Sequence, residues 1–413
     1  MRSIVKASLL GLPVVLLSAC GLVLGLPGSD EVKNDFDGGK PGDSSVADTS
    51  PQKDGALVDG PISDAPFDAT CNADLTIDGK NCGACGHDCL GGACTASKCQ
   101  PVKVVGSSSL APFTMTLSGN TLYFTNIKGN SLGSLAKAQK TATNNDVGAV
   151  ILSDWSSKQG TPYQVAANGT DVYFAVYSGS AANMLWDGAL MRCPSETCPP
   201  ALTVSGVEGY GIATDGANVY TSERAYVGNV DKYLIRKRNM DLSSPVLMGE
   251  AGSSANWMTL TPSEIIWGDD DGIYHCAKGG CGGPPQKLAS PWSLSADQIA
   301  IVGNTVYFTS NPFNGVATVQ SVAIGGGLPQ TLAKDLDVPF GIAADATYFY
   351  VAEIQDISNP STGRIFRCPV AGCGINNQNL EVLFTGENPR AVLSDTNAIY
   401  FGTREGNIYR LAK

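Results

Sequence analysis

Histidine is almost absent from this sequence: only His87 and His275 occur among 413 residues. No serine–histidine–aspartate set can be assembled around either of them. One Gly-x-Ser-x-Gly match occurs at residues 129–133, but it lies in an expected hairpin loop, whereas a nucleophile elbow needs a strand-to-helix turn. The sequence also lacks a phosphate-binding loop and a dinucleotide-binding fingerprint. The sequence therefore does not decide whether the protein is an enzyme, but the lack of catalytic motifs favours a protein that is not one.

Positive charge is scarce as well. The sequence has 27 basic residues (lysine and arginine) against 38 acidic ones, which gives a formal net charge of −11. A nucleic-acid partner is not expected, because binding to phosphates needs a basic surface. Many of the acidic residues lie in residues 27–70, which contain ten acidic residues and three lysines but almost no aromatic residues. Such a segment cannot bury enough apolar surface to fold, so we expect residues 20–70 to be a disordered, flexible linker.

A long membrane-spanning run is missing too. Two basic residues precede a short apolar run over residues 7–19, which has the form of a secretory signal. The sequence Leu-Ser-Ala-Cys that ends at Cys20 resembles the lipobox of bacterial lipoproteins. This resemblance implies that residues 1–19 are a signal peptide, and that Cys20 carries a diacylglycerol and a further acyl chain such as palmitate. It also implies an anchor in the outer membrane, facing the periplasm or the cell surface. An uncleaved helix through Leu26 is the alternative.

From Pro101 onward the chain is repetitive. The repeat unit occurs seven times and has two parts. The first part is a short apolar strand that begins with a proline or asparagine, usually followed by an aromatic residue. The second part is a turn and a second strand that carries an aromatic anchor. The anchors recur every 40 to 50 residues, at Tyr123, Tyr173, Tyr220, Trp267, Tyr307, Tyr350 and Tyr400. A period in this range with Gly/Asn/Asp turns is typical of propeller blades. The sequence therefore predicts an all-β fold, a seven-bladed β-propeller with four-stranded blades over residues 101–413.

The seventh blade is expected to take its fourth strand from the N-terminal side of the repeats. Only three of its strands can be assigned, the last ending near Leu411, and Pro101–Val105 resembles the fourth strand Pro285–Ala289 of another blade. We therefore expect this N-terminal strand to complete blade seven and close the ring. Closure removes exposed sheet edges, which otherwise template aggregation.

Thirteen cysteines contrast with the scarcity of histidine. Six of them lie close together, at Cys71, Cys82, Cys85, Cys89, Cys94 and Cys99. In an exported protein this density predicts disulfides, so residues 71–100 are expected to form a small disulfide-rich knob. Six cysteines allow fifteen pairings, and the sequence does not choose among them. A zinc site is the alternative, with the ligands Cys82, Cys85, His87 and Cys89.

The other six cysteines form three Cys-x4-Cys pairs after the third strands of blades two, four and six. They are Cys193 with Cys198, Cys276 with Cys281, and Cys368 with Cys373. Each pair is expected to clip the hairpin between strands three and four. With Cys20 lipidated, no free thiol is left for catalysis.

Three short motifs resemble known families. Residues 78–86 read Asp-Gly-Lys-Asn-Cys-Gly-Ala-Cys-Gly, which resembles the hallmark of the stigma-specific cysteine-rich family. Similar modules precede repeat domains in bacterial exported lipoproteins. Residues 339–345 and 210–215 resemble the NHL repeat, and residues 123–126 resemble the YVTN-type propeller repeat. The resemblance implies an interaction module. Some such propellers are lyases or lactonases with a metal on the top face, but their ligand sets have no matching residues here.

One position of the repeat is expected at the mouth of the central channel, because it follows the start of each first strand. Its residues are Phe113, Tyr163, Tyr210, Trp257, Trp292, Phe340 and Arg390. Such a ring suits a sugar, a peptide or a planar ligand through stacking and cation–π contacts. The alternative is that these rings pack between blades, as repeated aromatics usually do.

The loops after the second strands are expected to crown the same mouth. They bring there Asn126, Tyr177, Glu223, Arg224, Asp270, Asp271, Glu353 and Arg404. Glu223 and Glu353 occupy equivalent positions, and a structural or top-face divalent cation is one use of such a pair. Solvated loop charges are the alternative. Residues 268–272, with three consecutive aspartates, are interpreted as a tight turn, and no cofactor is predicted.

Together these patterns predict a lipid-anchored envelope lipoprotein whose propeller is a binding module. The expected ligand is an envelope protein, a peptide or a polysaccharide, bound at the aromatic mouth. Two alternatives stay open: a hydrolase or lyase that uses carboxylates at that mouth, and a purely structural envelope protein.

Overall fold

The computed structural model describes residues 67–68, 71–128, 132–143, 150–154, 161–177, 188–194, 198, 202–205, 207–228, 230–290, 298–311, 316–354 and 362–413. All of them belong to one compact unit, Ser63–Lys413. The expected signal peptide, Cys20 and nearly all of the linker lie outside the described residues. No helix of the described part is long and apolar enough to cross a membrane.

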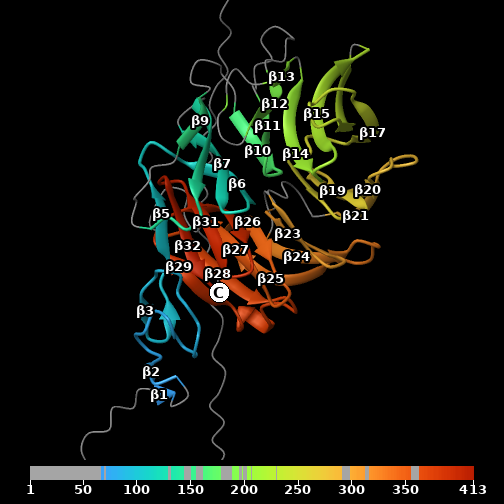
Figure 1. Cartoon of the computed structure of the whole chain (residues 1–413). Coiled ribbons are helices and arrows are strands. Elements are labelled where there is room, and N and C mark those ends of the chain that lie inside the picture. The colour runs from blue at the N-terminus through green and yellow to red at the C-terminus, as the bar shows by residue number, and fades with distance from the viewer. Residues whose placement is uncertain are drawn as a thin grey trace, which may run out of the picture. The chain divides into compact units, whose positions relative to one another are not determined.

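Seven four-stranded antiparallel sheets follow one another along the chain (Figure 1). Blade one consists of β6 (Pro112–Ser118), β7 (Thr121–Lys128), β8 (Leu132–Gln139) and β9 (Val150–Asp154). Blade two consists of β10 (Thr161–Ala167), β11 (Asp171–Tyr177), β12 (Ala189–Pro194) and β13 (Leu202–Ser205). Blade three consists of β14 (Glu208–Thr214), β15 (Val219–Val227), β16 (Val230–Arg238) and β17 (Val246–Ala251). Blade four consists of β18 (Trp257–Leu260), β19 (Glu264–Asp269), β20 (Gly272–Ala277) and β21 (Gln286–Ala289).

The remaining blades repeat this order. Blade five consists of β22 (Ile299–Val302), β23 (Thr305–Ser310), β24 (Ala317–Ala323) and β25 (Gln330–Leu336). Blade six consists of β26 (Val338–Ala344), β27 (Tyr348–Ile354), β28 (Arg364–Pro369) and β29 (Glu381–Thr385), with the short 3-10 helix η1 (Ile375–Asn377) before β29. Blade seven consists of β30 (Pro389–Ser394), β31 (Ala398–Thr403), β32 (Asn407–Ala412) and β5 (Val102–Gly106). The seven-bladed, four-stranded prediction is confirmed.

The strand from the N-terminal side closes the ring as expected. β5 pairs antiparallel with β32, with Val105 opposite Ile408 and Val102 opposite Arg410. Figure 1 shows β5 beside the C-terminal strands, although the two segments are some 300 residues apart in the sequence. Val104 and Val105 are fully buried in the core that blade seven shares with blade one. Apolar burial therefore stabilises the closure in addition to the strand hydrogen bonds.

The core lies between neighbouring blades, because alternate residues of each second strand point to opposite faces of the sheet. In β23, Val306 and Phe308 pack with blade four, whereas the anchor Tyr307 packs with blade six. The anchors Tyr123, Tyr173, Tyr220, Tyr350 and Tyr400 are buried in the same way. Both faces of each second strand are covered, which explains their almost continuous apolar runs.

In blade four the predicted anchor, Trp267, is wrong by one residue. Trp267 pairs with Met258 as Phe308 pairs with Ile299, and it packs with blade three. The residue equivalent to Tyr307 is therefore Ile266, which packs toward blade five. The aromatic character of Trp267 caused the error, since the repeat was aligned on aromatic side chains.

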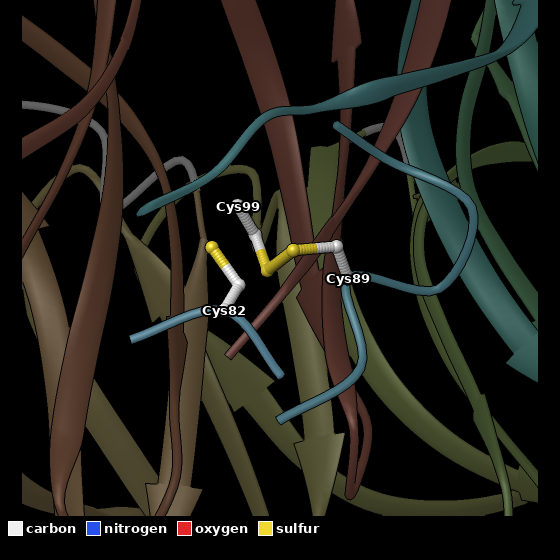
Figure 2. Close-up of side chains that lie close together, drawn as sticks. All are labelled: Cys82, Cys89 and Cys99. Carbon is white, nitrogen blue, oxygen red and sulfur yellow. A yellow bond between two sulfur atoms is a disulfide. The ribbon is translucent and has the colours of Figure 1, made fainter. Parts of the chain in front are cut away.

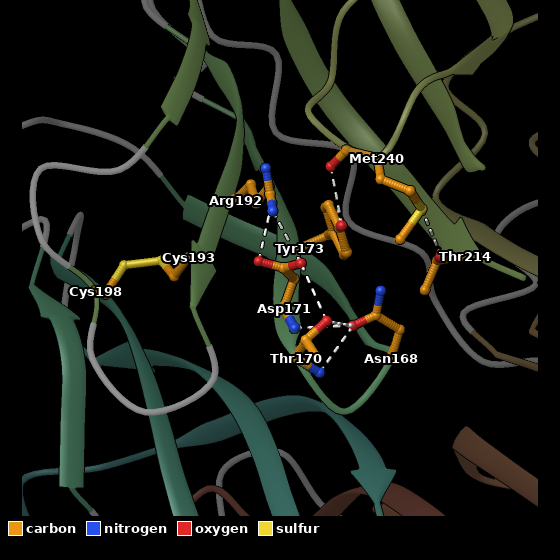
Figure 3. A network of polar contacts seen from close by, with 9 residues as sticks. All are labelled: Asn168, Thr170, Asp171, Tyr173, Arg192, Cys193, Cys198, Thr214 and Met240. Atoms are coloured by element: carbon orange, nitrogen blue, oxygen red, sulfur yellow. Dashed lines mark hydrogen bonds and ion pairs between the residues drawn. A yellow bond between two sulfur atoms is a disulfide. The ribbon is translucent and has the colours of Figure 1, made fainter. Parts of the chain in front are cut away.

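The turns between first and second strands carry a repeated polar network. Asp215, Asp345 and Asp395 each accept hydrogen bonds from two main-chain amides of their turn and from the hydroxyl of a tyrosine anchor. Asn168 caps the equivalent turn of blade two (Figure 3). There, the Tyr173 hydroxyl instead donates to the Met240 carbonyl of blade three, 2.9 Å away.

A second polar contact lies beside that turn in blade two. Asp171 binds Arg192 through two parallel hydrogen bonds of 2.9 and 3.0 Å, next to the disulfide Cys193–Cys198 (Figure 3). Burial raises the pKa of Tyr173 to about 12, and the nearby Asp171 carboxylate acts in the same direction. Tyr173 is therefore a neutral hydrogen-bond donor at physiological pH. The hydrogen bond from Tyr173 to Met240 joins blade two to blade three, whereas the pair of Asp171 and Arg192 lies within blade two.

The cysteine-rich knob carries three disulfides, Cys71–Cys85, Cys82–Cys94 and Cys89–Cys99. Its strands are two short pairs, β1 (Phe67–Asp68) with β2 (Ala73–Asp74), and β3 (Cys94–Thr95) with β4 (Lys98–Cys99). The three predicted Cys-x4-Cys clips are also present, each beginning in the third strand of its blade. The predicted disulfides are confirmed, and the structure supplies the pairing that the sequence left open.

The knob contacts the propeller through blades six, seven and one. The guanidinium of Arg410 in β32 donates to the carbonyls of Lys140, at 2.7 Å, and of Leu90 in the knob. Lys98 of the knob forms an ion pair of 2.9 Å with Glu381. The knob therefore contacts blade seven, the sheet in which β5 closes the ring.

Candidate functional site

A β-bulge places the predicted mouth residues. In blades one, two, three, six and seven, the pairing between first and second strand shifts register just after the first strand begins. The residues in these bulges include Phe113, Tyr163, Tyr210, Phe340 and Arg390. A bulge bends its strand and re-aims a side chain away from the regular pleat. Five of the seven predicted mouth residues therefore share one structural cause.

Arg390 lies between two of these rings. Its guanidinium carbon is 5.8 Å from the centroid of Phe113 and 5.5 Å from that of Phe340. Both distances are within the range of a cation–π contact. Gly341, next to Phe340, is required here, because a Cβ at that position would come within 2.4 Å of the Arg390 carbonyl oxygen. The blades thus approach each other closely enough to put three side chains in contact.

Tyrosines continue the same row. The Tyr163 ring centroid lies 5.6 Å from that of Phe113, 5.8 Å from Tyr177 and 5.9 Å from Tyr210. Tyr210 in turn lies 6.1 Å from Tyr233. We call the whole row the aromatic arc; it comprises Phe340, Arg390, Phe113, Tyr163, Tyr177, Tyr210 and Tyr233. The arc runs over blades six, seven, one, two and three.

A small pocket lies beside the arc. It has a volume of about 30 Å³ and is lined by Phe113, Thr114, Tyr163, Asn256, Trp257, Gln298, Phe340 and Arg390. A space of this size holds about one water molecule. This pocket therefore has no room for a larger ligand.

A wider cavity of about 380 Å³ lies further along the first strands. All seven first strands contribute to its lining, and Trp257 and Gln298 border both spaces. The Gln164 side chain joins three blades there, since its oxygen accepts from the amides of Ile212 and Met258. These buried amide contacts hold the first strands around the channel.

Two tryptophans of the predicted ring are not equivalent to the others. In blade four the position that matches Phe113 is Asn256, and Trp257 follows it without a bulge, packing into the core toward blade five. Trp257 nevertheless lines the small pocket beside Phe113. Trp292 lies outside the described residues.

The paired glutamates are buried, so neither is a solvated loop charge. Glu223 is 0% exposed and binds Arg238 through two hydrogen bonds of 2.8 and 3.0 Å, with Arg236 at 3.0 Å. Glu353 is equally buried, binds Arg364, and accepts from the amide of Asp337 at 2.8 Å. Each carboxylate is neutralised by arginine of its own blade. Burial with strong partners makes them structural ion pairs.

The aspartates of blade four divide into two kinds. Asp269 is buried and accepts from the amides of Asp271 and Gly272, which confirms the predicted tight turn. Burial raises the pKa of Asp269. Asp270 is exposed, and its carboxylate has no ion-pair partner among the described residues. Of the four predicted carboxylates, Asp271 is bound by Lys287 at 2.9 Å, which leaves Asp270 as the one without an ion-pair partner in the described part of the chain.

Sequence reasoning missed Glu208 and Tyr233. Glu208 is 0% exposed, accepts from the Tyr210 hydroxyl at 3.2 Å, and lies 3.5 Å from the Arg224 guanidinium. Arg224 also binds Asp231 at 2.7 Å and lies over the ring of Tyr233. Burial raises the pKa of Tyr210, and the Glu208 carboxylate adds to this rise. An acidic residue at the start of an apolar strand was the available signal for Glu208.

The zinc alternative is incompatible with the disulfides of the knob. The sulfurs of Cys82, Cys89 and Cys99 lie within 4.8 Å of one another, but all three are in disulfides, and Figure 2 shows the Cys89–Cys99 bond. Zinc binds thiolates, which a disulfide does not offer. Both ring nitrogens of His87 lie 2.5 Å from main-chain oxygens, of Cys82 and Lys413.

Comparisons with known proteins identify the fold and no family. No family model matches the chain, and no curated protein matches it. Among solved structures, virginiamycin B lyase from Staphylococcus aureus has a TM-score of 0.52 at 15% identity, covering 76% of this chain and 98% of the lyase. The GH74 enzyme of Niastella koreensis has 0.53 at 12%, covering 75% of this chain and 53% of that enzyme. A puromycin-hydrolyzing peptidase from Mycobacterium tuberculosis has 0.50 at 12%, covering 74% and 52%. Such neighbours support the β-propeller fold alone.

Proposed function

We propose that this protein is an exported, outer-membrane lipoprotein whose propeller is a non-enzymatic binding module. The ligand is an envelope protein, a peptide or a polysaccharide, held across the aromatic arc. The anchor rests on the lipobox-like sequence that ends at Cys20. The stigma-specific and NHL-like motifs fit the same description, since related modules occur in exported interaction proteins.

The aromatic arc is the observation that carries this proposal. The second strands of six blades already supply a buried tyrosine anchor to the core. The arc residues Phe113, Tyr163 and Phe340 are only half-buried. Contiguous, partly exposed aromatics on a protein surface are typical of interaction sites.

A capture experiment tests the proposal. The full-length protein, immobilised, is incubated with an extract of envelope proteins and polysaccharides, and bound material is measured. We expect the double substitution Phe113→Ala and Phe340→Ala to abolish capture while the protein stays folded. Leu328→Ala is the matched control, because Leu328 is 92% exposed and lies outside the arc. Equal capture by the double variant and the wild type would overturn the proposal.

The anchor is tested separately by fractionation. We expect Cys20→Ala to move the protein from the membrane to the soluble fraction of the envelope. A wild-type protein that is already soluble would contradict the anchor without affecting the binding site.

The enzymatic alternative has lost two of its four candidate carboxylates. Glu223 and Glu353 are each held by arginine in the interior of a blade. The lyase and the GH74 enzyme share the fold with this chain at 15% and 12% identity, which supplies no catalytic residue. A purely structural role predicts neither capture nor turnover.

A further inference from the structure

A cavity lies where the knob meets blades seven and one, and it has a volume of about 280 Å³. Its lining comes from the knob, from the turn after β8 and from blade seven, and consists of Leu90, Lys140, Thr141, Thr143, Asp395, Asn397, Tyr400 and Arg410. A volume of this size is close to the lower end of the range for pockets that bind small molecules. None of these residues belongs to the aromatic arc, so the cavity is a separate place in the molecule.

Arg410, in the wall of this cavity, is buried without a counter-charge. Only 5% of its surface is exposed. Its guanidinium donates to the carbonyls of Lys140 and Leu90, and among the described residues its Nε has no hydrogen-bond partner and its charge no ion-pair partner. The other buried arginine in the described part of the chain, Arg238, is held by the carboxylate of Glu223.

The uncompensated charge of Arg410 favours an anion. Burial lowers the pKa of Arg410, and the nearby Asp395 carboxylate acts in the opposite direction without forming an ion pair with it. An arginine side chain does not give up its proton in a protein, so the group stays charged in spite of its burial. A buried charge without a counter-charge is costly, because water no longer solvates it. The two carbonyl contacts fix the guanidinium in place but carry no negative charge.

The charges of the lining favour a ligand with a single negative charge. Two cations, Lys140 and Arg410, lie in the wall together with one carboxylate, Asp395, which leaves one positive charge. Lys140 and Asp395 neutralise each other at 2.8 Å. A carboxylate is planar and matches the fork of the guanidinium with two parallel hydrogen bonds. A phosphate dianion would bring one negative charge more than the cavity balances.

Three uncharged side chains of the lining offer further hydrogen bonds. Within the part of the chain that the structure describes, the side chains of Thr141, Thr143 and Asn397 have no hydrogen-bond partner. A Cβ at Gly91 of the knob would lie 3.5 Å from Nη2 of Arg410 and 3.5 Å from Cγ2 of Thr143. The threonine and the guanidinium therefore reach the same glycine. Hydroxyl and amide groups around a guanidinium suit a ligand with hydroxyl groups in addition to its carboxylate.

We propose that this cavity binds a small organic acid that carries hydroxyl groups, with its carboxylate on Arg410 and its hydroxyls on the two threonines and Asn397. The inference goes beyond the proposed binding function, because it concerns a second site that shares no residue with the aromatic arc. The acid supplies the counter-charge that Arg410 lacks. It contacts the knob, blade seven and blade one together, so its binding stabilises the folded protein.

Isothermal titration calorimetry tests the proposal with the full-length protein. The probes are glucuronate, which has a carboxylate and hydroxyls, and glucose, which has hydroxyls alone. We expect glucuronate to bind and glucose not to bind. Arg410→Gln is expected to weaken glucuronate binding about tenfold, because glutamine cannot supply the charge that holds the carboxylate. Arg404→Gln is the matched control, since Arg404 is an exposed arginine of the same blade outside the cavity.

Thermal unfolding separates a binding site from a purely structural role of Arg410. Saturating glucuronate should raise the unfolding midpoint of the wild type and leave that of Arg410→Gln unchanged. If Arg410→Gln does not fold, Thr143→Val takes its place, with binding about threefold weaker than in the wild type. The proposal is overturned if the wild type does not bind glucuronate, if glucose binds equally well, or if the variant binds glucuronate as tightly as the wild type. Capture at the arc is measured with Phe113→Ala and Phe340→Ala, so the two proposals fail independently.

Discussion

The ammonium of Lys413 lies 2.7 Å from the carboxylate of Asp345 and joins blade seven to a turn of blade six. The same relationship occurs twice more, between Lys278 and Asp215 at 3.2 Å and between Lys140 and Asp395 at 2.8 Å. In each case the lysine directly follows the third strand of the next blade. These ion pairs are repeated links between neighbouring blades.

The Asp345 link makes stability depend on pH. Burial alone would raise the pKa of Asp345, but Lys413, two main-chain amides and the Tyr350 hydroxyl hold it down at about 2. A carboxyl in the unfolded chain has a pKa near 4, so the folded state gains on the order of 2 kcal/mol above that pH. This stability is lost as the pH falls from about 4 toward 2. We expect Asp345→Asn to lower the free energy of unfolding by a similar amount at pH 7, measured by urea denaturation.

A matched variant checks that interpretation. Asp335→Asn removes an exposed carboxylate whose nearest lysine is 3.9 Å away, and it should change stability very little. The difference between Asp345→Asn and the wild type should also shrink below pH 4. A constant difference from pH 7 to pH 3 would show that the charge of Asp345 is not the cause.

Breaking the buried pair of Glu223 and Arg238 should be costly. Glu223→Gln leaves a buried guanidinium without a counter-charge, which typically costs about 3 to 5 kcal/mol. Glu250→Gln is the control, because Glu250 is 51% exposed and its pair with Lys232 should contribute less than about 1 kcal/mol. Thermal unfolding of both variants measures the contrast. Comparable losses would mean that burial does not govern these pairs.

Ring closure by β5 can be tested by removing the strand. Deletion of residues 101–106 exposes the edge of β32 and removes the buried Val104 and Val105. We expect a cooperative loss of folded structure across the whole propeller, seen as a lower midpoint in thermal unfolding. Val105→Asp should act in the same direction, whereas Lys103→Asp on the same strand should have a small effect. Full thermal stability of the deletion variant would contradict the closure.

The twelve described cysteines should contain no free thiol, since all of them are in disulfides. Titration of the unfolded, unreduced protein checks this, and two or more reactive thiols would contradict the pairing. Replacing Cys368 and Cys373 by alanine should cost about 2 kcal/mol, because the clip closes a short loop.

The recurrence of turns and short apolar strands was sufficient to predict seven blades and the closing strand. It was not sufficient for the register within blade four, where Trp267 has the chemistry of an anchor but the position of Phe308. An alignment of repeats matches residues by their type. The face of the sheet to which a side chain points depends instead on the hydrogen-bond register of its strand, and a shift of one residue moves the side chain to the opposite face. The same shift separated Trp257 from the other mouth residues.

The sequence by itself determined the fold, the cysteine-rich knob and six of the seven residues that the aromatic arc brings together, because these depend on periodic patterns along the chain. Only the tertiary structure decided that Glu223 and Glu353 are buried ion pairs, that Glu208 and Tyr233 belong to the site, and which cysteines pair. The reason is physical: the arginines and tyrosines that change the role of each carboxylate come from other strands of the sheet. Which side chains meet across a sheet depends on strand register and bulges, and neither is written in the local sequence.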